Sequence, residues 1–115
     1  MQYTPNYWRI VKVQGEHFVD ASGGKGKDHY RVFGMWSGGY LDSDHWRLNS
    51  GITSVTEKDG YYYFQGSSGS EYVCYKNNQG LSSYGAGVIS DIIRNNTAKI
   101  SLLPEDTNPL LLDYS

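Results

Sequence analysis

At 115 residues the chain has the length of one ordinary domain, and we expect a single domain over residues 1–115 that buries a core without metals or disulfides. Its formal net charge of −2 argues against strong non-specific nucleic-acid binding, which depends on Lys and Arg neutralising phosphates. The single cysteine excludes an internal disulfide framework and fits a reducing compartment. Because no apolar run is long enough to span a bilayer, we expect a cytoplasmic protein.

The N-terminal third predicts a hairpin. Met1–Asn6 is a polar lead-in, and Tyr7–Val13 has the composition of a strand. A two-residue turn after it would return the chain as a second strand over Glu16–Ala21, with Ile10 opposite Val19. Both faces of this hairpin carry apolar residues, so we expect it to be covered on both sides.

His29–Trp36 predicts the next strand, and Gly34 within it marks a bulge or a close backbone approach. The segment Tyr40–Asn49 permits two interpretations. It forms either a short strand with a kink at Asp42–Asp44, or an irregular loop that ends in a strand over Trp46–Leu48.

The stretch Ile52–Lys76 carries the strongest structural signal, because it reads as three antiparallel strands joined by two tight turns. Asp59-Gly60 is typical of a type I′ turn, which needs positive φ at both central residues. That turn fixes the register of the first hairpin as Lys58 opposite Tyr61, Thr56 opposite Tyr63, and Val55 opposite Phe64.

The second turn, Ser67–Ser70, is predicted as a four-residue loop. This length places Phe64 opposite Val73 and Tyr62 opposite Tyr75. The remaining face of the meander would then carry Tyr61, Tyr63, Gln65, Tyr72 and Cys74. We expect that face either to be covered in a small barrel or sandwich, or to form an exposed tyrosine surface.

The C-terminal third predicts one helix over Ser83–Arg94, capped by Ser82 or Ser83, and a strand over Ala98–Leu103. Near the chain end, Leu110, Leu111 and Leu112 are expected to pack on the domain, or on a second copy in a homodimer. The whole pattern predicts a mainly β (α+β) fold: a small antiparallel, strongly bent sheet or barrel of about seven strands, with this helix packed on it.

Asp42, Asp44 and His45 form the one polar cluster with catalytic or metal-binding side chains. Two carboxylates and an imidazole are suitable ligands for a divalent cation. An alternative hypothesis is a small hydrolase that uses His45 with Asp42 or Asp44. Their spacing matches no metal-binding loop, so a polar loop is favoured, and we predict no metal and no cofactor.

Cys74 is the other reactive group to weigh. With His17, His29 or His45 it would form a thiol–base pair or a Cys/His site. It lies in mid-strand, however, where a cysteine more often behaves as a small hydrophobe. No esterase elbow, zinc-protease or dinucleotide motif is present, so we do not expect an enzyme.

Aromatic and Arg side chains point instead to binding, because they supply large contact areas with polar tips. The predicted binding residues are Tyr40, Trp46, Arg47, Tyr61, Tyr63 and Tyr72. We therefore expect a small protein-binding module, and its size, slight acidity and lack of catalytic motifs are typical of a phage or mobile-element inhibitor that binds a host protein. A nucleic-acid-binding barrel of the SH3-like or OB type is the alternative.

Overall fold

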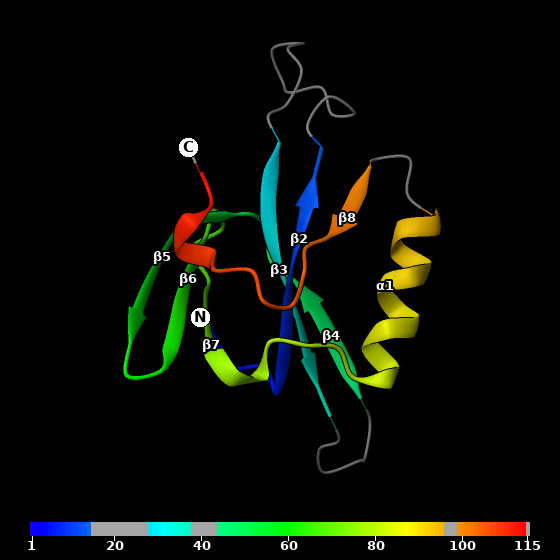
Figure 1. Ribbon diagram of the computed structural model, residues 1–115, viewed down its shortest axis with the longest axis horizontal. Coiled ribbons are helices and arrows are strands. Elements are labelled where there is room, and N and C mark those ends of the chain that lie inside the picture. The colour runs from blue at the N-terminus through cyan, green and yellow to red at the C-terminus, as the bar shows by residue number, and fades with distance from the viewer. Residues whose placement is uncertain (15–27, 38–43, 96–98, 115) are drawn as a thin grey trace.

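The computed structural model describes residues 1–14, 28–37, 44–95 and 99–114 (Figure 1). In chain order its elements are β1 (Gln2–Tyr3), β2 (Tyr7–Val13), β3 (His29–Trp36), β4 (His45–Leu48), β5 (Ile52–Lys58), β6 (Tyr61–Gly66), β7 (Glu71–Tyr75), η2 (Lys76–Asn78), α1 (Ser83–Asn95), β8 (Ile100–Leu102) and η3 (Pro109–Leu111).

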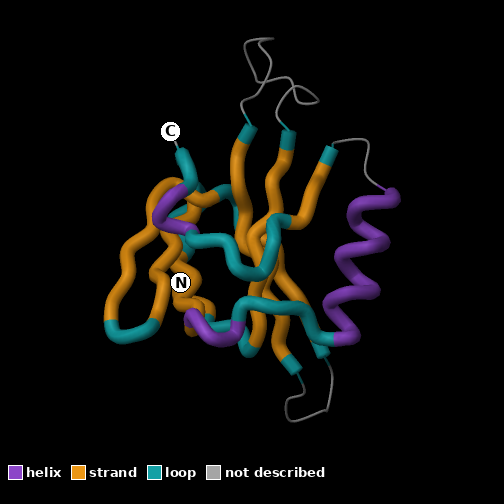
Figure 2. Tube along the Cα trace, in the orientation of Figure 1, coloured by secondary structure: helices purple, strands orange, loops and turns teal. Residues whose placement is uncertain are grey.

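The strands form two four-stranded sheets with the orders β1-β7-β6-β5 and β4-β3-β2-β8. We call these sheet A and sheet B. Sheet B lies between sheet A and α1, so the molecule is layered as sheet, sheet and helix (Figure 2). The predicted mainly β fold with one packed helix is confirmed, and the predicted strands are divided between two sheets.

The main core lies between the two sheets because the strands of each turn one apolar face inward. Its buried members are Trp8, Ile10 and Val32 from sheet B, and Ile52, Tyr62, Phe64, Tyr72 and Cys74 from sheet A. Trp8 is fully buried, with its ring centroid 5.5 Å from that of Phe64 and 5.7 Å from that of Tyr62. Its indole Nε1 donates a hydrogen bond of 2.7 Å to the Tyr75 carbonyl, which attaches β2 to the end of β7.

A second core forms on the other face of sheet B, under α1. Val11, Phe33 and Met35 are buried there against Ile89 of the helix. The prediction that β2 is covered on both faces is therefore confirmed. The helix begins where expected, because the Ser82 hydroxyl accepts a hydrogen bond from the Gly85 amide.

The hairpin of β5 and β6 has the predicted register. Val55 lies opposite Phe64 and Lys58 opposite Tyr61. Asp59 and Gly60 have φ values of 54° and 86°, which are the positive values that the turn requires.

The predicted register of β6 and β7 is wrong by one residue. Phe64 lies opposite Tyr72 rather than Val73, and Tyr62 lies opposite Cys74. The loop is one residue shorter than predicted, because the Gly66 amide donates to the Ser70 carbonyl and the Gly69 amide donates to the Gly66 carbonyl. Since side chains alternate between faces, Tyr72 and Cys74 enter the core, and Val73 and Tyr75 move to the face of Tyr61.

The N-terminal predictions need two corrections. Gln2–Tyr3 is a strand rather than a lead-in, and it pairs in parallel with β7. The return strand Glu16–Ala21 lies outside the described residues, but its predicted pairing of Ile10 with Val19 is wrong. Ile10 lies opposite Val32 of β3, and its carbonyl on the other edge accepts from the Leu103 amide.

Two local expectations are settled by packing. Gly34 allows a close approach, because a Cβ there would lie 3.2 Å from the Pro5 side chain. In the tail, only Leu112 packs against the core between the sheets, whereas Leu110 and Leu111 are 45% and 81% exposed. The expectation that all three leucines pack on the domain is wrong for those two, and a homodimer contact through them stays a prediction.

We expect Trp8→Ala to lower the free energy of unfolding by about 3–5 kcal/mol, because it empties the centre of the core between the sheets. Trp8→Phe keeps most of the volume but leaves the Tyr75 carbonyl without its donor, at a cost of about 1–3 kcal/mol. Urea unfolding measures both. Trp46→Ala, at a residue that is 38% exposed, is the control and should cost less than Trp8→Ala.

Two helix glycines offer a matched comparison. A Cβ on Gly85 would lie 2.1 Å from Met35 Sδ, whereas a Cβ on Gly87 would meet nothing within 4 Å. Gly87→Ala should stabilise the protein by about 0.5–1 kcal/mol through helix propensity. Gly85→Ala gains the same propensity but overpacks the core under α1, which costs about 1–3 kcal/mol. Equal unfolding midpoints for the two variants would contradict the close packing of α1 on β3.

Candidate functional site

The predicted binding residues do not form one patch. Tyr61 and Tyr63 alternate with the buried Tyr62 and Phe64, so they lie on the outer face of sheet A. Tyr72, predicted on that face, lies in the core instead. Trp46 and Arg47 lie on opposite faces of β4, with the Trp46 ring 5.7 Å from that of Phe33 and the Arg47 guanidinium 4.6 Å above the ring of Tyr3. Tyr40 lies outside the described residues.

The first candidate surface is the outer face of β5, β6 and β7. Tyr61 and Tyr75 lie opposite each other on neighbouring strands, with ring centroids 5.1 Å apart. Tyr61 and Tyr63 are half-buried, and Tyr75 is 38% exposed. Thr56 and Lys58 of β5 flank this row and are exposed. We call Tyr61, Tyr63 and Tyr75 the tyrosine row.

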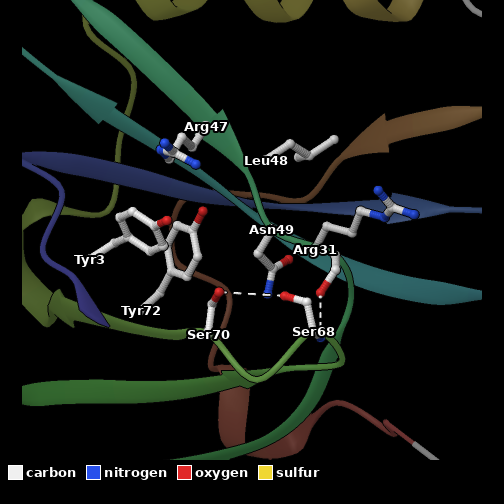
Figure 3. A pocket seen from close by; sticks show the side chains of 9 residues that line it. Tyr3, Arg31, Arg47, Leu48, Asn49, Ser68, Ser70 and Tyr72 are labelled. Carbon is white, nitrogen blue, oxygen red and sulfur yellow. Dashed lines mark hydrogen bonds between the residues drawn. The ribbon is translucent and has the colours of Figure 1, made fainter. Parts of the chain in front are cut away.

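The second candidate surface is a pocket of about 200 Å³ where the end of β4 meets the turn between β6 and β7 (Figure 3). It is lined by Tyr3, Arg31, Arg47, Leu48, Asn49, Ser50, Ser68, Ser70 and Tyr72. Two arginines line the pocket and no acidic residue is among these lining side chains. We call it the Arg–Ser pocket.

Asn49 forms the floor of the Arg–Ser pocket and is 3% exposed. Its amide orientation is fixed, because Oδ1 accepts a hydrogen bond of 2.8 Å from the Val32 amide. Nδ2 is buried and has no hydrogen-bond partner. Figure 3 shows this nitrogen directed towards Ser68 and Ser70. A buried amide donor left unpaired costs about 1–3 kcal/mol, so this group is suited to bind an acceptor that enters the pocket.

The serine turn forms the wall facing Asn49. The Ser50 hydroxyl accepts hydrogen bonds of 2.9 Å from the Ser68 amide and from the Ser67 hydroxyl, and these bonds attach the turn to the segment between β4 and β5. Gly66 allows this approach, because a Cβ there would lie 3.2 Å from the Ser70 carbonyl oxygen and 3.5 Å from Asn49 Nδ2.

Arg47 is the cationic residue that lies beside Tyr72 in the Arg–Ser pocket, whereas the Arg31 guanidinium is directed away from Asn49 and the serines (Figure 3). Burial raises the pKa of the Tyr72 phenol, and the Arg47 guanidinium opposes that rise. Arg31 contacts His29, with 3.0 Å between Arg31 Nε and His29 Nε2. Arg31 also lines a neighbouring cavity of about 330 Å³, with His29, Ser50 and Ser67 among its walls.

The predicted chemical groups are not assembled into a site by the part of the chain that the structure describes. Within those ranges no group of three or more His, Cys, Asp or Glu side chains is placed to hold a metal ion. The His45 ring stacks on Trp36, with centroids 5.0 Å apart and planes inclined by 3°. Asp42 and His17 lie outside the described residues, so the hydrolase hypothesis and the pairing of Cys74 with His17 stay predictions.

The sequence predicted Arg47 and Tyr72 as binding residues, but it did not indicate Asn49, Ser68 or Ser70, which also shape the Arg–Ser pocket. Asn49 is the last residue of the segment Tyr40–Asn49, for which the sequence permits two interpretations, and Ser68 and Ser70 are explained by the predicted turn. A serine-rich turn is a weak signal, because the same composition serves the turn itself. The pocket also needs two segments that are distant in sequence, which only the packing of sheet A on sheet B brings together.

Comparison of the chain with protein-family models, with curated proteins and with solved structures finds no match.

Among the described residues, no helix has the length and apolar character needed to cross a membrane.

The thiol of Cys74 should be unreactive in the folded protein. It is fully buried, and burial raises its pKa, so it stays protonated at neutral pH. We expect a thiol-reactive dye at pH 8 to label Cys74 at the rate of global unfolding, and to label it at once in concentrated urea. Rapid labelling of the native protein would contradict this assignment and support the thiol–base hypothesis.

Proposed function

We propose that the chain is a non-enzymatic binding protein that acts in the cytoplasm and holds another protein against the tyrosine row. The observation that carries this proposal is the placement of Tyr61, Tyr63 and Tyr75 on one sheet face, each partly exposed. Tyrosine rings supply large contact areas with a polar tip and lose little side-chain entropy on binding, which suits an interface.

The scaffold behind the row supports a binding role. Between the row residues of β6 lie Tyr62 and Phe64, which are buried against Trp8 in the core. Since both neighbouring strands are hydrogen-bonded to β6, the backbone that carries Tyr61 and Tyr63 is ordered before any partner arrives. Binding therefore costs little backbone entropy. The exposed polar residues of β5 beside the row resemble the polar rim that surrounds the apolar centre of an interface.

The cytoplasmic location rests on the free thiol of Cys74, which is compatible with a reducing compartment. A protein partner is preferred to a nucleic acid because the chain has a formal net charge of −2, and strong non-specific nucleic-acid binding depends on Lys and Arg neutralising phosphates.

The experiment is affinity capture from a bacterial lysate, followed by measurement of the affinity for the purified partner. We expect Tyr61→Ala and Tyr63→Ala each to weaken binding about tenfold, because truncating an interface hot spot costs at least about 1–2 kcal/mol. Tyr7→Ala is the matched control, since Tyr7 is 41% exposed and belongs to sheet B.

Urea unfolding of each variant must show that its fold is retained. A partner held equally well by the double variant Tyr61→Ala/Tyr63→Ala would exclude the tyrosine row as the binding surface. Capture that disappears after nuclease treatment and at high salt would instead support the nucleic-acid alternative.

A further inference from the structure

The groups that face into the Arg–Ser pocket are mostly hydrogen-bond donors. Arg47 presents N–H groups, Asn49 presents its unpartnered Nδ2, and the hydroxyls of Ser68 and Ser70 rotate to donate. The two hydroxyl oxygens lie 3.4 Å apart, so the bond between them is weak and either hydrogen is available to a ligand. A ligand that fits this pocket must therefore bring acceptors.

The charge of the pocket indicates which acceptor fits. No carboxylate is among the lining side chains, and Arg47 is the arginine on the side of Tyr3 and Tyr72, whereas the Arg31 guanidinium is directed away from the serines (Figure 3). Arg47 lies at the rim, where it is exposed and its guanidinium stacks on the ring of Tyr3. A cation is disfavoured, since metal ions prefer carboxylate, imidazole or thiolate ligands, and these side chains do not line the pocket. A neutral molecule would satisfy Asn49 but leave the positive charge uncompensated.

We infer that the Arg–Ser pocket binds a phosphate-type oxyanion. Its oxygens accept from Asn49 Nδ2 at the floor, from Ser68 and Ser70 on the wall and from Arg47 at the rim. The volume of about 200 Å³ lies below the range of about 300–1,000 Å³ found for drug-sized ligands, so the pocket holds a small group. This site is separate from the tyrosine row, because Ser68, Asn49 and Arg47 are not part of the outer face of sheet A.

The site is built before the ligand arrives, which supports specific binding. Asn49 is held by Val32 on both backbone and side chain, with the Asn49 amide 3.0 Å from the Val32 carbonyl. The serine turn is attached to Ser50 and to the Gly51 carbonyl, which accepts from the Ser67 amide at 2.9 Å. Preorganised donors lose little entropy when they bind an anion.

Titration of the full chain with inorganic phosphate, followed by NMR at constant ionic strength, tests the inference. We expect saturable shifts of the Asn49 side-chain amide and of the backbone amides of Ser68 and Ser70, with no such shifts when chloride replaces phosphate. Arg47→Gln should weaken phosphate binding about tenfold, because charge-assisted hydrogen bonds are the strong ones. Arg94→Gln is the matched control, since Arg94 is an exposed arginine of α1, and should bind phosphate as the wild type does.

Asn49→Asp provides the sharper variant. It keeps an acceptor for the Val32 amide but replaces the donor at the floor with a carboxylate oxygen, so phosphate binding should be lost. If this variant does not fold, the double variant Ser68→Ala/Ser70→Ala, at one exposed and one half-buried residue, is expected to weaken binding several-fold. Linear shifts that do not saturate, or equal affinities of wild type, Arg47→Gln and the serine double variant, would overturn the site.

Phosphoserine and a nucleoside monophosphate are titrated beside free phosphate to show what carries the anion. Saturable binding of any of the three at Asn49 supports the oxyanion site, and the tightest identifies the source of the phosphate group. Failure of all three overturns the site but leaves the tyrosine row untouched, because that proposal is tested by different residues and a different readout.

Discussion

The burial of Trp8 between the sheets is the interaction on which the other features depend. Its ring packs on Tyr62 and Phe64, its indole N–H donates to the Tyr75 carbonyl, and its own carbonyl accepts from the Gly80 amide. One residue of β2 thus contacts β6, the last residue of β7 and the segment that follows β7. Because side chains alternate, fixing Trp8 inward also directs Val11 to α1, and fixing Tyr62 inward directs Tyr61 outward. The tyrosine row is a consequence of this core.

The local parts of the fold were predictable wherever a short motif prescribes its own geometry. Asp59-Gly60 adopts positive φ at both residues, and the register of β5 and β6 followed from that turn. The helix over Ser83–Asn95 followed from apolar spacing and a serine cap. The predicted length of the turn after β6 was wrong, because Ser67-Ser68-Gly69 is a three-residue loop in which Gly69 has φ of 90°. A glycine in third position is the signal of this loop, and it was available in the sequence.

What could not be predicted are the contacts between segments that are distant in the chain. β1 is two residues long and owes its strand geometry to pairing with β7, where Gln2 Nε2 also donates to Glu71 Oε1 at 2.8 Å. β2 pairs with β3 and β8, whereas the sequence predicted the return strand Glu16–Ala21 as its partner. The Arg–Ser pocket likewise joins the end of sheet B to a turn of sheet A. Arg47 and Tyr72 were named as binding residues for their type, and it is the pocket, not a shared sheet face, that brings them together.

The turn between β6 and β7 has two consequences at once, which links the two candidate surfaces. Its length determines which side chains of β7 face the core. Tyr72 and Cys74 face inward, and Tyr75 lies beside Tyr61 on the outer face. The hydroxyls of Ser68 and Ser70 also form the wall of the Arg–Ser pocket, and Ser70 is two residues before Tyr72 in the chain. A loop one residue longer would turn each side chain of β7 to the opposite face of the sheet. Cys74 would then be exposed, and the Tyr72 phenol would move away from Arg47. The length of this turn therefore determines both which tyrosines face outward and whether the donors of the pocket converge.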